Sequence, residues 1–305
     1  MGLRIVLLIG AALTMLASGC FKPMLTTNDV VVRPDGTVQL VAFMENATLP
    51  GLRNSIRCQW VRFSSGQTQI GRARSGEEGL AFLDCRLPAD ATSYIATARF
   101  LFWQMQSTGR VFRWTKDRTI IVVDIDDTIC DTNREEIIFH KRDLESSPIR
   151  HAQPTLARLA ESFQIAYLTA RPESLFVKTV NWLNDHQFPP GPVFVAPSLG
   201  RMIRQTKYKT HALHTLRADW PNIRIGIGDS NVDARAYSDN NMLTLIVAEE
   251  YQENLDRQAI VLRDWSGIEK FFESNRPVLT DPASLAHIIE TGGSFTVPYA
   301  PATDR

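Results

Sequence analysis

Residues 119–128 read TIIVVDIDDT, and this stretch decides how the rest of the chain is interpreted. Four apolar β-branched residues in a row, Ile120 to Val123, are typical of a strand buried on both faces of a sheet. Three carboxylates, Asp124, Asp126 and Asp127, follow within four positions. Because like charges at this spacing repel one another, we expect other parts of the chain to supply groups that hold them.

Four more apolar runs follow, with helical patterns between them. The runs are QIAYLT (164–169), PVFVA (192–196), IRIGIGD (223–229) and LTLIVA (243–248), and the helical patterns include PTLARLAES (154–162), PESLFVKTVNWLNDH (172–186) and THALHTLRADW (210–220). This alternation predicts an α/β fold whose parallel sheet is covered by helices on both faces. Ligands bind such sheets outside the carboxyl ends of the strands, which is where the acidic cluster lies.

The region upstream has a different rhythm. Segments such as TVQLVAFMEN, IRCQWVRF and YIATARFLFWQ alternate apolar and polar residues, with the turn signals PDG, SSG and STG between them. A period of two predicts an antiparallel β-sandwich. We therefore expect five parts: a signal peptide at 1–19, a tether at 20–28, a β-sandwich domain at 29–115, an α/β domain at 116–275 and a loosely ordered C-terminal tail at 276–305.

The N-terminus, MGLRIVLLIGAALTMLASGC, predicts export from the cytoplasm. One arginine precedes an apolar stretch that is too short to span a bilayer comfortably and that ends in small residues. LASGC (16–20) is similar to a bacterial lipobox, whose cysteine is lipidated and becomes the first residue of the mature chain. Lipidation of Cys20 would anchor the protein in the bacterial outer membrane, facing the periplasm, because Phe21 and Lys22 lack the aspartate that commonly retains lipoproteins at the inner membrane. An uncleaved anchor, or a plain signal peptide with an incidental cysteine, is the alternative.

Export also affects the other three cysteines. Cys58 and Cys85 both lie in the region of period two, and we expect a disulfide between them; two buried thiols are the alternative. A cysteine phosphatase needs an arginine six positions after its cysteine, whereas Glu136 stands six positions after Cys130. Cys130 is therefore predicted to have no catalytic role.

The charge balance excludes one class of partner. Lysine plus arginine and aspartate plus glutamate each number 33, so the formal net charge is zero. A chain without an overall basic field is not expected to bind nucleic acid.

Two interpretations of the DIDDT cluster need no partner residues. In a calcium loop that begins at Asp124, the sixth position requires glycine for a sharp turn, but the sequence has the β-branched Ile129, and a strand precedes the loop where a helix should. The second interpretation is a solvated strand end without a role.

A third interpretation uses side chains from the later runs. Thr169 ends the second apolar run, and Asp229 and Asp233 follow the fourth, in GDSNVD. Lys209 opens a helical pattern, with Lys207 as the competing lysine. Because the carboxyl ends of parallel strands meet at one edge of a sheet, all of these side chains could converge there.

The ordered pattern of these residues resembles the four motifs of the haloacid dehalogenase superfamily of phosphotransferases. The motifs are Asp124-x-Asp126-x-Thr128, Thr169, Lys209 and Gly228-Asp229-x-x-x-Asp233, within roughly residues 116–250. The wording FPPGPVF (188–194) and GDSNVDARAY (228–237) is similar to the phosphatidate phosphatase domains of the lipin and actin-patch-protein type. The resemblance implies a Rossmann-like sheet and a Mg²⁺-dependent phosphomonoesterase that acts on phosphatidate or a related phospholipid monoester.

The resemblance also implies the chemical roles. Asp124 would attack phosphorus and form an aspartyl phosphate. Asp126 would protonate the leaving alkoxide and then deprotonate the attacking water. Thr169 and Lys209 would bind the phosphoryl oxygens. The Mg²⁺ ligands would be oxygen atoms of four residues: Asp124, Asp126 through its backbone carbonyl, Asp229 and Asp233.

Spacing and composition bear on the remaining alternatives. The gaps of 45 residues before Thr169 and 40 residues after it leave no room for a large cap domain, which suits a substrate too large to be enclosed. Gly226-x-Gly228 lacks the third glycine of a dinucleotide-binding loop, and His211 and His214 are interpreted as a surface pair and not as zinc ligands. A general exported phosphatase for nucleotides or small phosphomonoesters, and a lipid-anchored binding module on a non-catalytic scaffold, remain as rival functions.

Overall fold

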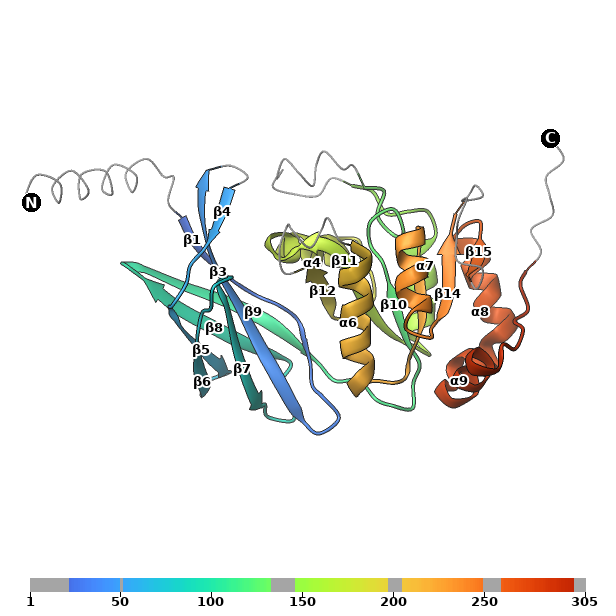
Figure 1. The fold of residues 1–305 in the computed structure, drawn as a ribbon, viewed down its shortest axis with the longest axis horizontal. Coiled ribbons are helices and arrows are strands. Elements are labelled where there is room, and N and C mark those ends of the chain that lie inside the picture. The colour runs from blue at the N-terminus through green and yellow to red at the C-terminus, as the bar shows by residue number, and fades with distance from the viewer. Residues whose placement is uncertain (1–21, 50–51, 133–145, 197–204, 249–258, 299–305) are drawn as a thin grey trace, which may run out of the picture. The chain divides into compact units, whose positions relative to one another are not determined.

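The computed structural model describes residues 22–49, 52–132, 146–196, 205–248 and 259–298 (Figure 1). These residues fall into two compact units, the first ending at Phe112 and the second beginning at Arg113. No helix in the described ranges is long and apolar enough to cross a membrane. The predicted signal peptide and the predicted lipidation site at Cys20 lie outside these ranges.

The first unit contains two β-sheets. One consists of β1 (Lys22–Thr27), β3 (Thr37–Leu49), β4 (Leu52–Ser55) and β7 (Leu80–Arg86). The other has the order β2 (Val30–Val31), β9 (Trp103–Phe112), β8 (Ser93–Phe100), β5 (Trp60–Ser65) and β6 (Thr68–Arg74). Neighbouring strands are antiparallel except for β2 and β9, which pair in parallel.

The alternation in the sequence determines which side chains form the core of this unit. In β5, Val61 and Phe63 are buried whereas Trp60 and Arg62 are exposed, and β8 buries Tyr94 in the same pattern. These side chains share one cluster with Leu40 and Met44 of β3, so both sheets contribute to a single core.

Two predictions for this unit are wrong. The segment expected as a tether contains β1, whose six residues pair with β3 from Lys22 opposite Ala47 to Thr27 opposite Ala42. Cys58 and Cys85 are free thiols and not a disulfide. Cys58 has a positive φ of 60° and an exposed side chain, whereas Cys85 lies in β7 and packs against the core, so the two side chains have different environments.

The second unit is built on the predicted parallel sheet. Its order is β12 (Val193–Ala196), β11 (Gln164–Pro172), β10 (Ile120–Val123), β13 (Ile223–Gly228), β14 (Leu243–Val247) and β15 (Ile260–Leu262), with every neighbouring pair parallel. β10 lies between β11 and β13 with all four residues buried, as expected for a central strand. β15 is a strand that the sequence did not predict.

Helices pack against this sheet. They are α3 (Ala152–Ala160), α4 (Phe176–Asp185), which follows the short helix η1 (Glu173–Leu175), α6 (Gln205–Asp219), α7 (Asn231–Ser238), α8 (Trp265–Thr280) and α9 (Pro282–Thr291). Leu156 of α3, Trp182 of α4 and Phe271 of α8 share one core with Ile121 and Val123 of β10. Helices α6 and α7 lie in front of the sheet in the view of Figure 1.

The prediction of a loosely ordered tail from residue 276 is wrong for residues 276–291. Helix α8 continues to Thr280 although Pro277 lies within it, and α9 follows directly. Leu279 and Leu285 are buried in the core of the second unit, and the Asp281 carboxylate accepts a hydrogen bond from the Ser284 backbone N–H (3.0 Å) at the start of α9. Burial and capping thus stabilise a segment whose composition suggests a loop.

The prediction that no large cap covers the site depends partly on residues 133–145 and 197–204. These residues lie outside the described ranges, so this stays a prediction.

Candidate active site

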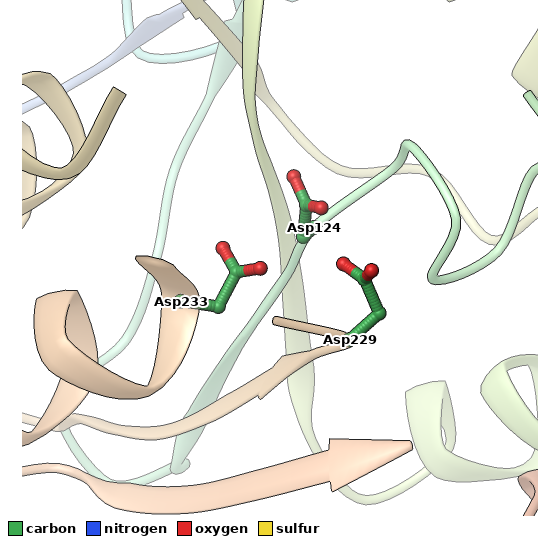
Figure 2. A group of neighbouring side chains, drawn as sticks. All are labelled: Asp124, Asp229 and Asp233. Carbon is green, nitrogen blue, oxygen red and sulfur yellow. The ribbon is translucent and has the colours of Figure 1, made fainter. Parts of the chain in front are cut away.

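The acidic residues of the site follow neighbouring strands of the parallel sheet. Asp124 comes directly after β10 and Asp229 directly after β13, while Asp233 lies in the first turn of α7 (Figure 2). The backbone N–H of Asp124 donates to the carbonyl of Ile227 in β13 (2.9 Å), which extends the pairing of the two strands to the start of the loop. The fold therefore brings together three carboxylates that are separated by as many as 109 positions in the sequence.

These three carboxylates form one group. A carboxylate oxygen from each of Asp124, Asp229 and Asp233 lies within 4.8 Å of the other two. The buried hydroxyl of Thr128, the last residue of the DIDDT motif, lies 3.3 Å from Asp124 Oδ2 and 3.3 Å from Asp229 Oδ1. Thr128 thus connects the first motif to the fourth.

Lys209 is the lysine of this group. Its side chain is buried, and Nζ donates to Asp124 Oδ1 (2.5 Å) and to Asp233 Oδ1 (2.6 Å). Lys207, the competing candidate, lies two residues earlier on the same helix and is exposed. The structure therefore places Lys209, and not Lys207, beside the carboxylates.

One lysine does not balance the charge of three carboxylates. Burial, followed by the charge of Asp233, raises the pKa of Asp124 well above its ordinary value. The same two causes raise the pKa of Asp229 to about 7. Burial alone would lower the pKa of Lys209, but the charges of Asp124 and Asp233 raise it, so this lysine is cationic at neutral pH. With all three carboxylates ionised, the group would carry two uncompensated negative charges.

The residues present fit a divalent cation. Hard ions such as Mg²⁺ take oxygen ligands, and the group offers carboxylate oxygens only. A charge of two would balance the two negative charges that Lys209 leaves uncompensated. Asp124, Asp229 and Asp233 are therefore the side chains that would hold the ion.

The side chain of Asp126 lies outside this group and has partners of its own. It accepts hydrogen bonds from Arg171 Nη2 (2.8 Å at Oδ1), Thr169 Oγ1 (2.9 Å at Oδ2) and Thr132 Oγ1 (3.0 Å at Oδ1). Burial would raise the pKa of Asp126, but the charge and hydrogen bonds of Arg171 hold it below its ordinary value. The carboxyl that was expected to act as an acid is thus held ionised, and the hydroxyl of Thr169 is engaged with it.

Arg171 is a residue of the site that the sequence interpretation missed. It is 2% exposed, its Nε and Nη2 both contact Asp126, and Nη1 donates to Thr179 Oγ1 (3.3 Å). A signal was present, since an arginine that continues the apolar run QIAYLT is buried only where an acidic partner exists. The sequence did not show which carboxylate that partner is.

Gly226 and Gly228 have a packing role. A Cβ on Gly226 would lie 2.2 Å from the ring of Tyr237, and one on Gly228 would lie 2.4 Å from Cβ of Asp233. Tyr237 and Asp233 both belong to α7, so the two glycines allow this helix to approach β13 closely. This close approach brings Asp233 to the other carboxylates.

The remaining candidates take no part in the group. Cys130 is buried, and its burial raises the pKa of the thiol, which disfavours the thiolate form. His211 and His214 are both exposed on α6.

Comparisons with known proteins bear on the second unit. Residues 121–245, which contain all four motifs and are less than half of the chain, match the family model described as the LNS2 (Lipin/Ned1/Smp2) domain of PITM 1-3. This match supports a phosphatase domain of the haloacid dehalogenase type. No curated protein matches the chain.

Several solved structures also share similarity with the chain. The M1 domain from titin is 18% identical with a TM-score of 0.23, and the match covers 31% of this chain and 95% of that domain. The titin kinase with its flanking domains is 18% identical with a TM-score of 0.23, covering 30% of this chain and 17% of that one. Immunoglobulin domains 1–4 of Sidekick-1 are 10% identical with a TM-score of 0.20, covering 36% and 30%. TM-scores this low carry no argument about fold or function.

The raised pKa of Asp229 leads to a prediction about stability. Its pKa of about 7 exceeds the ordinary value of 3.8, so the folded state binds more protons than the unfolded state between about pH 4 and pH 7. The contribution of Asp229 to stability is present below this window and is lost as the pH rises through about 7. In the metal-free protein at pH 8, Asp229→Asn should therefore raise the free energy of unfolding, by about 2 kcal/mol once the partial exposure of the side chain is allowed for.

Denaturant unfolding in EDTA at pH 5 and pH 8 measures this difference. The free energy of unfolding of the variant, relative to that of the wild type, should increase as the pH rises. Saturating Mg²⁺ should remove this increase because the variant lacks one ligand. Asp185→Asn, which alters an exposed aspartate on α4, is the matched control. The prediction would be contradicted if the wild type became more stable relative to the Asp229→Asn variant between pH 5 and pH 8.

Proposed function

We propose that the protein is a Mg²⁺-dependent phosphomonoesterase that works through an aspartyl phosphate on Asp124. The observation that carries this proposal is the group of Asp124, Asp229 and Asp233 (Figure 2), of which Asp124 and Asp233 are buried and Asp229 partly buried. Lys209 Nζ donates to both Asp124 and Asp233. A non-catalytic scaffold would have no need to maintain buried like charges, because an isolated buried carboxylate is costly. The match of residues 121–245 to the LNS2 domain model supports the same class of reaction.

The residues of the site can perform the two steps of such a reaction. In the first step a carboxylate oxygen of Asp124 bonds to phosphorus while the bond from phosphorus to the ester oxygen breaks, and the leaving alkoxide takes up a proton. In the second step the oxygen of a water molecule bonds to phosphorus, the bond to Asp124 breaks, and the water loses a proton. When bound, Mg²⁺ would supply positive charge beside the phosphoryl oxygens. Lys209 Nζ, 2.5 Å from Asp124, is close enough to contact an oxygen of the group that Asp124 attacks.

Asp126 is the group for the proton transfers. Ionised by its contacts with Arg171, it is ready to accept a proton from the attacking water. To protonate a leaving alkoxide it must first take up a proton itself, which the contact with Arg171 opposes. Substrates whose leaving groups need little protonation should accordingly react faster.

For the substrate we propose phosphatidate or a related phospholipid monoester. The support is the likeness of FPPGPVF (188–194) and GDSNVDARAY (228–237) to phosphatidate phosphatase domains, together with the family model that residues 121–245 match. Spacing that leaves no room for a large cap suits a substrate that stays partly in a membrane.

Phosphate release tests both parts of this proposal. We expect release from phosphatidate in mixed micelles to require Mg²⁺, to stop in EDTA, and to exceed release from a nucleoside monophosphate in kcat/KM. A preference for the nucleotide of tenfold or more corresponds to about 1.4 kcal/mol of transition-state stabilisation. Such a result would replace the proposed lipid phosphatase by a general exported phosphatase. Absence of release from either substrate would instead favour a binding module.

We also propose that the mature chain begins at a lipidated Cys20 and is anchored in the bacterial outer membrane, facing the periplasm. Two or three acyl chains hold a protein on a bilayer effectively permanently, which would confine the site near a lipid substrate. Intact-mass analysis of the membrane fraction should show a chain of residues 20–305 with added acyl mass. A Cys20→Ser variant should lack this mass, and a mature N-terminus at another residue would disprove the anchor.

A further inference from the structure

The hairpin of β8 and β9 ends in an exposed apolar tip. The two strands pair up to Phe100 opposite Trp103, and Leu101 and Phe102 form the connection between them (Figure 1). The exposed fraction is 62% for Leu101, 70% for Phe102 and 37% for Trp103, although these are large hydrophobic side chains. The ring centroids of Phe102 and Trp103 lie 5.5 Å apart, so these two rings form one apolar surface at the tip.

Arginines line the outer face of the sheet next to this tip. The register pairs Trp60 of β5 with Arg74 of β6, and Arg62 with Arg72 in the next row. Arg99 of β8 follows Ala98, which pairs with Val61, so it lies beside the row of Trp60 and Arg74. All five side chains are exposed, and the guanidinium of Arg72 stacks on the ring of Trp60 at 4.5 Å.

The charge on this part of the sheet has one sign. Strands β5, β6, β8 and β9 contain neither aspartate nor glutamate, and four of their five arginines lie in these two rows. The fifth, Arg110, pairs with Asp29 at the other end of the hairpin. The acidic residues nearest to these strands along the chain are Glu77 and Glu78, in the turn after β6, and Asp90, before β8. The chain as a whole has equal numbers of acidic and basic residues, so this concentration of arginine is local.

The shape and the chemistry of the surface select the kind of partner. A projecting apolar tip needs a medium that it can enter, and a protein partner would have to offer a matching cavity, whereas the hydrocarbon of a bilayer accepts any such tip. Tryptophan is favoured at the boundary between hydrocarbon and headgroups. Arginines directly behind the tip would then lie at the level of the lipid phosphates.

We propose that this tip, Leu101 to Trp103, docks on the surface of an anionic phospholipid bilayer, with Arg62, Arg72, Arg74 and Arg99 contacting the headgroups. This surface belongs to the first unit and contains no residue of the candidate active site. The proposal therefore stands whether or not the protein is a phosphatase.

Vesicle sedimentation tests the proposal without any measurement of phosphate release. The test protein consists of residues 20–305 with the substitution Cys20→Ser, so it lacks the N-terminal apolar segment and the acylation site. It retains every described buried residue of both cores, of which the first is Leu25. This protein should sediment with vesicles of equal parts phosphatidylglycerol and phosphatidylcholine, and much less with phosphatidylcholine alone. Phe102→Ser with Trp103→Ser should reduce the fraction bound at least tenfold, while Arg62→Gln with Arg99→Gln should reduce the preference for phosphatidylglycerol.

The matched control is Phe82→Ser, which removes a 49% exposed phenylalanine from β7 in the other sheet and should leave binding unchanged. All the substituted side chains are exposed, so thermal unfolding should show that every variant folds. The proposal would be overturned if the parent chain did not bind the vesicles, or if the tip variant bound as well as the parent. It would also be overturned if Phe82→Ser reduced the bound fraction as much as the tip substitutions do.

Discussion

Asp124→Asn should lower Mg²⁺-dependent phosphate release by at least about a hundredfold, because the neutral amide cannot attack phosphorus. The substitution keeps the shape of the side chain, and it removes one of the negative charges that crowd the buried group. The variant should therefore be folded and at least as stable as the wild type in EDTA. Loss of activity together with retained stability would identify a chemical role and not a structural one.

The neighbouring Asp127 provides a matched control for this experiment. Asp127→Asn makes the same chemical change three residues later in the same loop, on an exposed side chain. Its positive φ of 59° also suits asparagine. It should keep phosphate release within about twofold of the wild type. An Asp124→Asn variant that retains more than about one hundredth of wild-type turnover would remove Asp124 from the role of nucleophile.

Lys209→Met should cause the largest loss of stability among the single substitutions considered. Methionine fills a similar volume, but it leaves Asp124 and Asp233 buried without their shared cation. Removal of one partner from a buried ion pair costs about 3–5 kcal/mol. Denaturant unfolding in EDTA at pH 8, where the carboxylates are most strongly charged, measures this loss directly.

The same variant should also lose phosphate release, since no positive side chain would remain beside Asp124. Lys207→Met is the control, because it makes the same change two residues earlier on α6 at an exposed position. We expect Lys207→Met to change the free energy of unfolding by less than about 0.5 kcal/mol. Equal effects of the two substitutions would show that the buried ion pairs of Lys209 do not stabilise the protein.

The parts of the fold that could be predicted are those in which local sequence and burial agree. Ile120 to Val123 form a central strand because a run of four apolar β-branched residues suits a position covered on both faces. By contrast, β1 reads KPMLTT and contains a proline, and its strand conformation depends on pairing with β3. The helix α8 was missed for a similar reason, since Pro277 argues against a helix and the burial of Phe271 and Leu279 in the core argues for one.

The candidate site shows the same division. The meeting of Asp124 with Asp229 could be predicted because both directly follow apolar strands, and parallel strands end at one edge of a sheet. The contact between Arg171 and Asp126 could not, because it joins side chains 45 residues apart whose orientations depend on the packing around them. The predicted disulfide between Cys58 and Cys85 was wrong. The alternation of apolar and polar residues on which it was based does not show the backbone conformation at Cys58, where φ is positive.

One residue beyond the matched stretch supports the loop of the candidate site. The indole Nε1 of Trp265, a fully buried residue, donates to the backbone carbonyl of Thr128 (2.8 Å), so the first residue of α8 holds the loop that carries Asp124. The stretch that matches the LNS2 domain model ends at residue 245, twenty positions before this tryptophan. A chain shortened to the matched stretch would retain every acidic residue of the site, and yet it would lose the support of the loop from which the first of them acts. In this protein the residues that support the candidate site therefore extend beyond the stretch that matches the family model.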